Sequence, residues 1–128
     1  MYENNVYKTD ILVVAGDILE IKVTSGVARY YKNGALQYTS SKAPVYPLRV
    51  ITSMIDSSSS IAQAMVNGTA PPPPSTGDVT WVNQVNTSVT GTTIRKTGGQ
   101  PFMEDAGAAS QQSVPSGNAT FQYTVDAQ

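Results

Sequence analysis

The stretch that decides the fold is residues 16–40, GDILEIKVTSGVARYYKNGALQYTS. From 17 to 23, apolar and charged residues alternate, which is the period of a half-buried strand. Two further strand-like runs follow at 27–32 and 35–39. Between them lies Asn33-Gly34, the strongest short-range signal for a hairpin, because a type I′ turn needs two residues at positive φ. The stretch therefore predicts antiparallel β-structure.

Short strand-like runs continue on both sides of this stretch, with turn residues between them. After the serine run 57–60, a short helix from Ile61 and a strand over 61–66 fit the sequence equally well. Many short strands at regular spacing are typical of sandwiches and barrels. We therefore expect an all-β fold, a jelly-roll-like antiparallel β-sandwich. The remaining strands are expected within 2–12, where there are two, and at 47–54, 79–82, 85–89, 92–96, 107–114 and 119–125.

The composition excludes several classes of function. Of the 128 residues, 13% are charged, and eight Lys and Arg against nine Asp and Glu give a net charge of −1. Such a chain has no basic field to hold a nucleic-acid backbone. The absence of His and Cys excludes Ser-His-Asp and Cys-His catalysis, His-ligated metals, zinc clusters and disulfides. A paired-carboxylate motif like that of jelly-roll glucanases is also missing, so we predict a protein that is not an enzyme.

The composition also bears on location. A low charge with much Ser, Thr, Asn, Gln and Gly suits an extracellular or cell-surface protein. The longest apolar run, 11–15, is too short to span a membrane. Residues 1–5 do not have the pattern of a signal peptide, so an exported protein would be represented here by a mature fragment or a piece of a longer chain.

Residues 71–74 are four consecutive prolines. Such a run favours an extended polyproline II rod that has no backbone donors to give to a sheet. We therefore predict a Pro-rich linker over 70–77, between a first segment at 1–69 and a second segment at 78–128. A rigid loop inside one domain is the alternative interpretation.

Short motifs in both segments resemble concanavalin A-like jelly-roll modules of tandem-repeat secreted and cell-surface bacterial proteins. In the first segment they are GDILEI (16–21), ARYYKNG (28–34), YTS (38–40) and PVYPL (44–48). In the second segment they are VTW (79–81), VNTSV (85–89), IRKT (94–97), DAGAAS (105–110) and TF (120–121).

The resemblance implies a permuted order. The segment 1–69 is similar to the carboxy-terminal half of a module, and the segment 78–128 to the amino-terminal half of the same or the next module. The central strands of the family pattern have no match, which implies a sandwich with exposed sheet edges and an exposed apolar face. Strands of a neighbouring copy can complete it and build a head-to-tail filament, or the remaining strands can close on one another.

Two functions follow as expectations from this resemblance. The first is a non-enzymatic module for adhesion or carbohydrate binding in a repeat-containing surface protein. The second is a structural subunit of an extracellular filament, assembled with identical copies by strand complementation.

For carbohydrate binding, the candidate residues are Tyr30, Tyr46 and Trp81. A flat aromatic face stacks on the apolar C–H face of a sugar, so these residues can contact glycans or a surface polysaccharide. Packing in the core is the competing role for each ring. Since Tyr30 is followed by Tyr31, the two are expected on opposite faces of their strand.

Charged residues offer weaker candidates. Glu104 and Asp105 lie in a loop with Gly and Pro and can supply oxygen ligands to calcium, but calcium needs six to eight oxygens and no third acid is near in sequence. A solvated loop is the competing interpretation. No other cofactor is expected. Arg95-Lys96 is expected on a solvated strand face.

Overall fold

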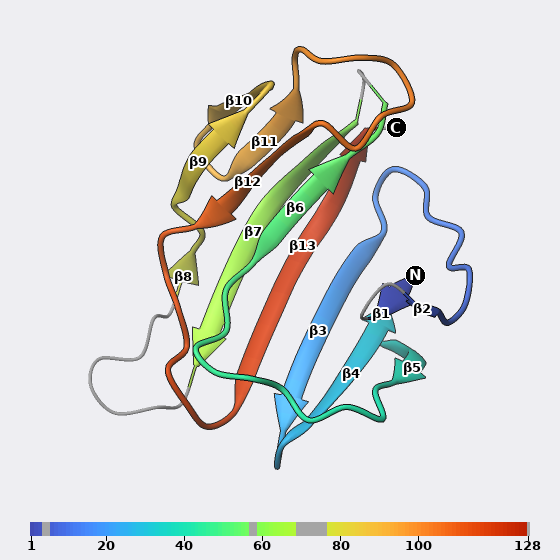
Figure 1. Ribbon diagram of the computed structural model, residues 1–128, viewed down its shortest axis with the longest axis vertical. Helices are drawn as coiled ribbons and strands as arrows, with labels where there is room; N and C mark the ends of the chain where they lie inside the picture. The colour runs from blue at the N-terminus through green and yellow to red at the C-terminus, as the bar shows by residue number, and fades with distance from the viewer. Residues whose placement is uncertain (4–5, 57–58, 69–76, 128) are drawn as a thin grey trace.

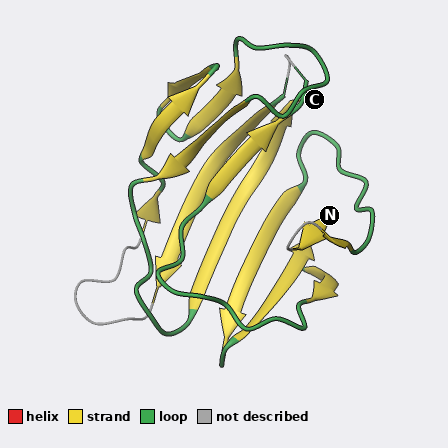
Figure 2. Ribbon diagram, viewed as in Figure 1, coloured by secondary structure: helices red, strands yellow, loops and turns green. Residues whose placement is uncertain are grey.

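The structure, a computed structural model, describes residues 1–3, 6–56, 59–68 and 77–127. These residues form strands, turns and loops without a helix (Figure 2). Neighbouring strands pair antiparallel throughout the three sheets. The all-β class expected from the sequence is therefore confirmed. No helix in the described ranges has the length and apolar character needed to cross a membrane.

The strands form two layers and a small hairpin (Figure 1). The large sheet has the order β10-β11-β7-β13-β3-β4-β5, with β8 paired to β7. The small sheet, β6-β12-β9, lies across a portion of one face of the large sheet. The strands are β1 (Tyr2–Glu3), β2 (Val6–Tyr7), β3 (Ile18–Thr24), β4 (Val27–Lys32), β5 (Ala35–Thr39), β6 (Ile51–Met54), β7 (Ser60–Gly68), β8 (Gly77–Asp78), β9 (Trp81–Val85), β10 (Thr87–Thr90), β11 (Thr93–Lys96), β12 (Ala106–Ser110) and β13 (Ala119–Ala127).

The hairpin predicted at Asn33-Gly34 is confirmed. Both residues have positive φ, 50° and 79°, and they join β4 to β5. The Asn33 side chain also ties the turn to the start of β3, because its Oδ1 accepts from the Ile18 amide at 2.9 Å and its Nδ2 donates to Asp17 Oδ1 at 2.7 Å. The meander β3-β4-β5 is therefore fixed by local sequence.

Some expected strands are shorter than predicted. The strand expected at 47–54 begins only at Ile51, and before it Leu48 forms an isolated bridge to Val114. The run 85–89 is divided at Asn86, whose φ of 51° breaks the strand into β9 and β10. The helix considered after the serine run is wrong, since 60–68 is strand β7 and pairs with β11 and β13.

Strand β13 lies at the centre of the large sheet, between β7 and β3. Strand β13 follows the Pro-rich segment in the chain, but both of its neighbours in the sheet precede that segment. Its Phe121 pairs with Val66 of β7 on one side and with Ile21 of β3 on the other. The predicted linker at 70–77 lies outside the described residues except for Gly77, which begins β8. The assignment of 1–69 and 78–128 to two halves of a module stays a prediction.

The core lies where the two sheets face each other. It combines the inward side chains of β7, β11 and β13 with those of β9 and β12. As predicted from the alternation in β13, Phe121 and Val125 are buried, at 7% and 6% exposed. Strand β12 fits close to β6 because residue 107 is glycine: a Cβ there would lie 2.1 Å from the Thr52 carbonyl oxygen. Strand β6 is thus held closely against its neighbour in the small sheet.

Candidate functional site: an open groove beside strand β6

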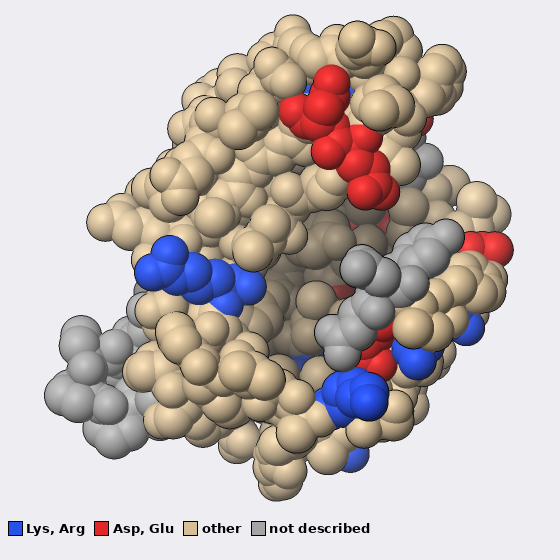
Figure 3. Space-filling view, in the orientation of Figure 1, with Lys and Arg blue, Asp and Glu red and all other residues tan. Residues whose placement is uncertain are grey.

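The small sheet leaves a portion of the large one uncovered. Strand β6 is an edge strand of the small sheet, and β3 and β4 of the large sheet continue beyond it (Figure 1). The space beside β6 is a cavity of about 630 Å³ lined by residues of β6, β13, β3 and β4. Figure 3 shows it as the hollow in the middle of this face. We call this cavity the groove.

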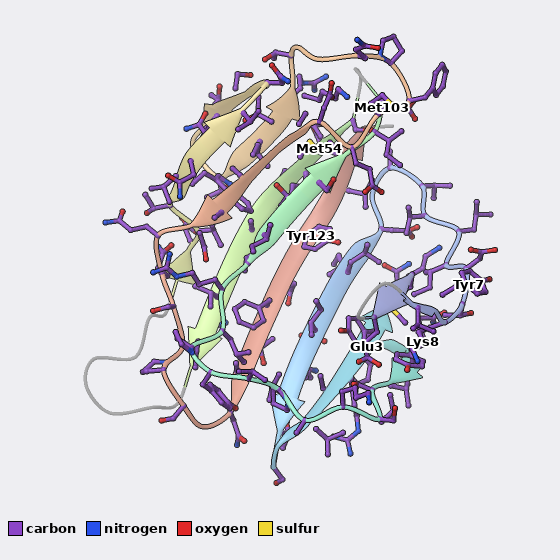
Figure 4. The ribbon with its side chains drawn as sticks, in the orientation of Figure 1. Glu3, Tyr7, Lys8, Met54, Met103 and Tyr123 are labelled. Carbon is purple, nitrogen blue, oxygen red and sulfur yellow. The ribbon has the colours of Figure 1, made fainter. Side chains whose placement is uncertain are left out.

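Apolar and aromatic side chains from three adjacent strands form the floor of the groove. Phe121 of β13 pairs with Ile21 of β3, and Ile21 pairs with Tyr30 of β4, so the three lie in one row across the sheet. Tyr123 follows two residues after Phe121 on the same face and lies at the middle of the sheet (Figure 4). Alternation along β3 and β13 thus places an apolar surface under the groove.

The wall of the groove is the edge of β6. Within the described residues β6 pairs with β12 on one side and has no strand on the other. Ile51 at its start is 78% exposed, whereas Met54 at its end is 5% exposed and belongs to the core. An unpaired strand edge presents backbone donors and acceptors in a row, and it is a template for another strand. Here that edge stands directly above an apolar floor.

A polar cluster closes the groove at its far side. Glu3 of β1 accepts hydrogen bonds from Ser40 Oγ and from the Tyr38 hydroxyl, the latter at 3.2 Å, and its carboxylate lies 3.9 Å from Lys8 Nζ. Figure 4 shows Glu3 and Lys8 together at the edge of β4. The Tyr38 ring also packs against Tyr30 with ring centroids 5.9 Å apart. This cluster fixes Tyr30 in the floor.

Burial and negative charge act on the two tyrosines of this cluster. Burial raises the pKa of Tyr30 and of Tyr38, and the neighbouring Glu3 carboxylate raises both further. Both hydroxyls therefore keep their protons well above neutral pH, and Tyr38 acts as a donor toward Glu3. The arrangement can bind and position a ligand.

The mouth of the groove carries positive charge. Lys42 and Arg49 line it, and both residues are exposed. In the described ranges no carboxylate forms an ion pair with either of them. A ligand with a negative group near one end is therefore favoured at this mouth.

The three aromatic residues predicted to bind sugar do not come together. Tyr30 lies in the groove floor. Tyr46 packs against the core, and its hydroxyl donates to the Gly117 carbonyl. Trp81 is only 5% exposed and belongs to the core. The sugar-binding prediction for Trp81 is therefore wrong, because its ring fills the space between the sheets and offers no face to a ligand.

The predicted calcium ligands are also not supported. Asp105 Oδ1 accepts from Lys96 Nζ at 2.8 Å, and its Oδ2 accepts from the Gln100 amide at 2.7 Å. These two contacts hold the pKa of Asp105 below its usual value, the Lys96 contact contributing most. Glu104 is exposed, and the described residues contain no cluster of three groups that could hold a metal ion. Asp105 therefore serves as the counter-ion of Lys96.

Lys96 itself was expected on a solvated face, and this prediction is wrong. The residue is 1% exposed, and its Nζ donates to the carbonyls of Ile55, Gln100 and Met103 at 2.9–3.0 Å as well as to Asp105. The burial of Lys96 could have been predicted from the sequence, because Lys96 lies two residues after Ile94 and therefore on the same face of the strand. Lys96 joins β11 to the end of β6 and so helps to hold the groove wall in place.

Comparisons of the chain with protein-family models, with curated proteins and with solved structures find no match. The likeness to concanavalin A-like modules therefore stays a prediction from short motifs. Function has to be argued from the groove itself.

Proposed function

We propose that the protein is a non-enzymatic structural subunit, acting outside the cell or at its surface, whose groove accepts a strand from a second copy. Repetition of this contact would build a head-to-tail filament. The observation that carries the proposal is the open edge of β6 above the apolar floor made by Phe121, Ile21 and Tyr30.

Two favourable terms act together when a strand enters such a groove. Its backbone pairs with the edge of β6, and every second side chain reaches the floor. Full burial of one large apolar side chain contributes about 1.5–3 kcal/mol. The floor side chains lose water at the same time, so both partners gain from the contact.

The position of β6 disfavours a symmetric dimer formed by two β6 edges. The large sheet extends past β6 beneath the groove (Figure 1). A twofold axis perpendicular to the small sheet would place the β3–β5 regions of two copies in the same layer and the same space. The incoming element must therefore be a different segment from the one that receives it. Contacts of that kind are heterologous and produce open chains of subunits.

Carbohydrate binding is the second candidate, favoured by one observation. Tyr30 lies in the groove beside a cluster that contains Glu3, and Arg49 stands at the mouth. An aromatic face with hydrogen-bonding neighbours suits a sugar ring. Of the three predicted aromatics, however, Tyr30 is the one that lines the groove, and the larger portion of the floor is aliphatic or phenylalanine.

The test is the mass in solution, by light scattering after size exclusion, over a wide range of protein concentration. We expect the wild type to grow from 13.6 kDa into a ladder of larger species. Ala28 lines the groove, so Ala28→Trp should fill it and keep the protein monomeric. The matched control is Ala35→Trp in an exposed position of β5, which should assemble like the wild type.

Two results would contradict the proposal. One is a wild-type protein that stays at 13.6 kDa at every concentration. The other is an Ala28→Trp variant that assembles as the wild type does. A monomer that binds glycans, and loses that binding with Ala28→Trp, would support the carbohydrate function instead.

A further inference from the structure

We propose that the strand entering the groove is residues 10–15, DILVVA, of a second copy. This inference rests on the proposed function and names its partner segment. It starts from an apolar segment that the fold leaves outside every sheet. Residues 11–15 are the longest apolar run of the chain, yet they belong to no strand in the structure. Ile and Val favour strands, so local preference and observed structure disagree here.

The segment exposes large apolar side chains at alternate positions. Leu12 is 83% exposed and Val14 is 55% exposed. Residues two apart project to the same side of a strand, so these two side chains can enter the groove together. A donor strand needs this spacing to reach an apolar floor while its backbone pairs with an edge.

The segment also matches the length of its receptor. Strand β6 has four residues, Ile51–Met54. The four residues 11–14 span about 13 Å when extended at roughly 3.3 Å each, which is the length of β6. Backbone pairing along the whole edge therefore needs no residue outside the apolar run.

Charges at the two ends agree with the pairing. Asp10 precedes the apolar run, is exposed, and forms no ion pair with a basic side chain of the described residues. The groove mouth carries Arg49 and Lys42, likewise without an ion-pair partner in those residues. Opposite charges at a contact between copies set its orientation and speed its formation. The donor would thus bring a carboxylate to a mouth that carries two cations.

Contacts at the base of the segment fix its place in its own copy, where Val13 lines a small pocket together with Ser53 and Met54 at the end of β6. The Gly16 amide donates to the Val125 carbonyl at 2.7 Å, and the Val14 amide donates to Asp17 Oδ2 at 2.8 Å. These bonds fix the segment beside the end of β13, where Figure 1 shows it as a loop standing out from the sheet. Lys32 Nζ also donates to the Leu12 carbonyl at 2.6 Å, so a strand that pairs through Leu12 and Val14 replaces this bond and the bond from the Val14 amide.

The test uses the absence of cysteine from the chain. Val13→Cys, on the face of the donor strand opposite to Leu12, is made in one preparation, and Ser53→Cys, on the exposed outward face of β6, in another, so that the two thiols lie on the same side of the paired strands. The two are mixed and oxidised, and the disulfide-linked dimer of the two variants is quantified by mass spectrometry. Ser116→Cys, exposed in a loop outside the groove lining, replaces Ser53→Cys as the control. We expect about tenfold more cross-link with Ser53→Cys, because binding raises the effective thiol concentration.

A charge exchange gives a second readout that does not depend on oxidation. Asp10→Lys alone and Arg49→Glu alone should each weaken assembly about tenfold, and the double variant should restore it, since each contact again joins opposite charges.

Equal cross-linking with Ser53→Cys and Ser116→Cys, or a double variant weaker than either single one, would overturn the assignment of this segment. If Ala28→Trp still prevents assembly in that case, the groove remains the receptor and another segment is the donor. If Ala28→Trp has no effect either, the proposed function fails as well.

Discussion

The two halves of the large sheet follow the same alternation but have different environments. Under the small sheet, the inward side chains are sealed: Val66 of β7 and Ile94 of β11 are both 0% exposed. Beyond β6, Ile21 of β3 and Tyr30 of β4 occupy equivalent inward positions and remain partly exposed. Both halves of the large sheet therefore have the residue pattern of a core, but the small sheet covers only one of them. On the proposed function, the uncovered half is the surface that receives a partner.

The largest effect is expected at the residue that holds the covered half together. Lys96→Met removes the cation to which Asp105 and several carbonyls point, and it should lower the free energy of unfolding by about 3–5 kcal/mol. Chemical denaturation measures it. Arg95→Met is the matched control, because Arg95 is exposed and its pair with Asp126 spans 3.5 Å, so a loss below about 1 kcal/mol is expected. Equal losses for the two variants would contradict the role of Lys96.

A pair of identical substitutions compares the two halves directly. Ile94→Ala opens a cavity in the sealed half and should cost about 2–5 kcal/mol of stability. Ile21→Ala removes the same atoms from the groove floor, where space already exists, and should cost clearly less in the monomer. On the proposed function, Ile21→Ala weakens assembly instead. The comparison fails if Ile21→Ala destabilises the monomer as much as Ile94→Ala.

The position of β6 can be disturbed through its closest backbone approach. Gly107→Ala would put a Cβ 2.1 Å from the Thr52 carbonyl oxygen, so β6 has to move. We expect a loss of about 1–3 kcal/mol, measured by thermal or chemical unfolding. Gly98→Ala is the control, since its Cβ would meet nothing closer than 3.3 Å and its φ is not positive. A Gly107→Ala protein as stable as Gly98→Ala would show that the two strands are not so closely fitted.

The smallest effect is expected from the loss of stability at low pH that follows protonation of Asp17, at the uncovered half of the large sheet. Asp17 accepts from Lys32 Nζ at 2.8 Å and from Val14 and Asn33, and these contacts lower its pKa to about 2, with Lys32 contributing most. A lowered carboxyl pKa adds stability above the unfolded value of 3.8 that is lost as pH falls toward 2. Denaturation of wild type and Asp17→Asn between pH 6 and about 2 should therefore converge at the acid end. A constant difference over this range would contradict it.

Local signals in the sequence predicted those elements of the fold that depend on neighbouring residues. The Asn33-Gly34 hairpin and the inward face of β13 are of this kind. The groove could not be predicted in the same way, because it depends on β13 lying between β3 and β7 and on β6 covering one half of the sheet. Trp81 shows the same limit: an aromatic residue in a strand can pack in the core or face solvent, and only its tertiary neighbours decide.

Lys96 lies between these two cases. Its burial could be anticipated from its place two residues after Ile94 on one face of β11. Its partners could not, since the Ile55 carbonyl is 41 residues away in the chain, and the carbonyls of Gln100 and Met103 reach Lys96 only because the loop after β11 folds back over it. Every residue has a backbone carbonyl, so the pattern of side chains does not show which carbonyls accept from Lys96.

The central place of β13 has a consequence for how the chain folds. Until residues 119–127 have left the ribosome, β3 and β7 have no partner between them, so the meander β3-β4-β5 and the strand β7 cannot join in one sheet. Pairs such as Ile18 with Thr124 are separated by more than a hundred residues. Contacts at such distances make folding slow. Newly synthesised chains therefore spend a period with apolar β-edges open, and this period is when they are most exposed to pairing with one another.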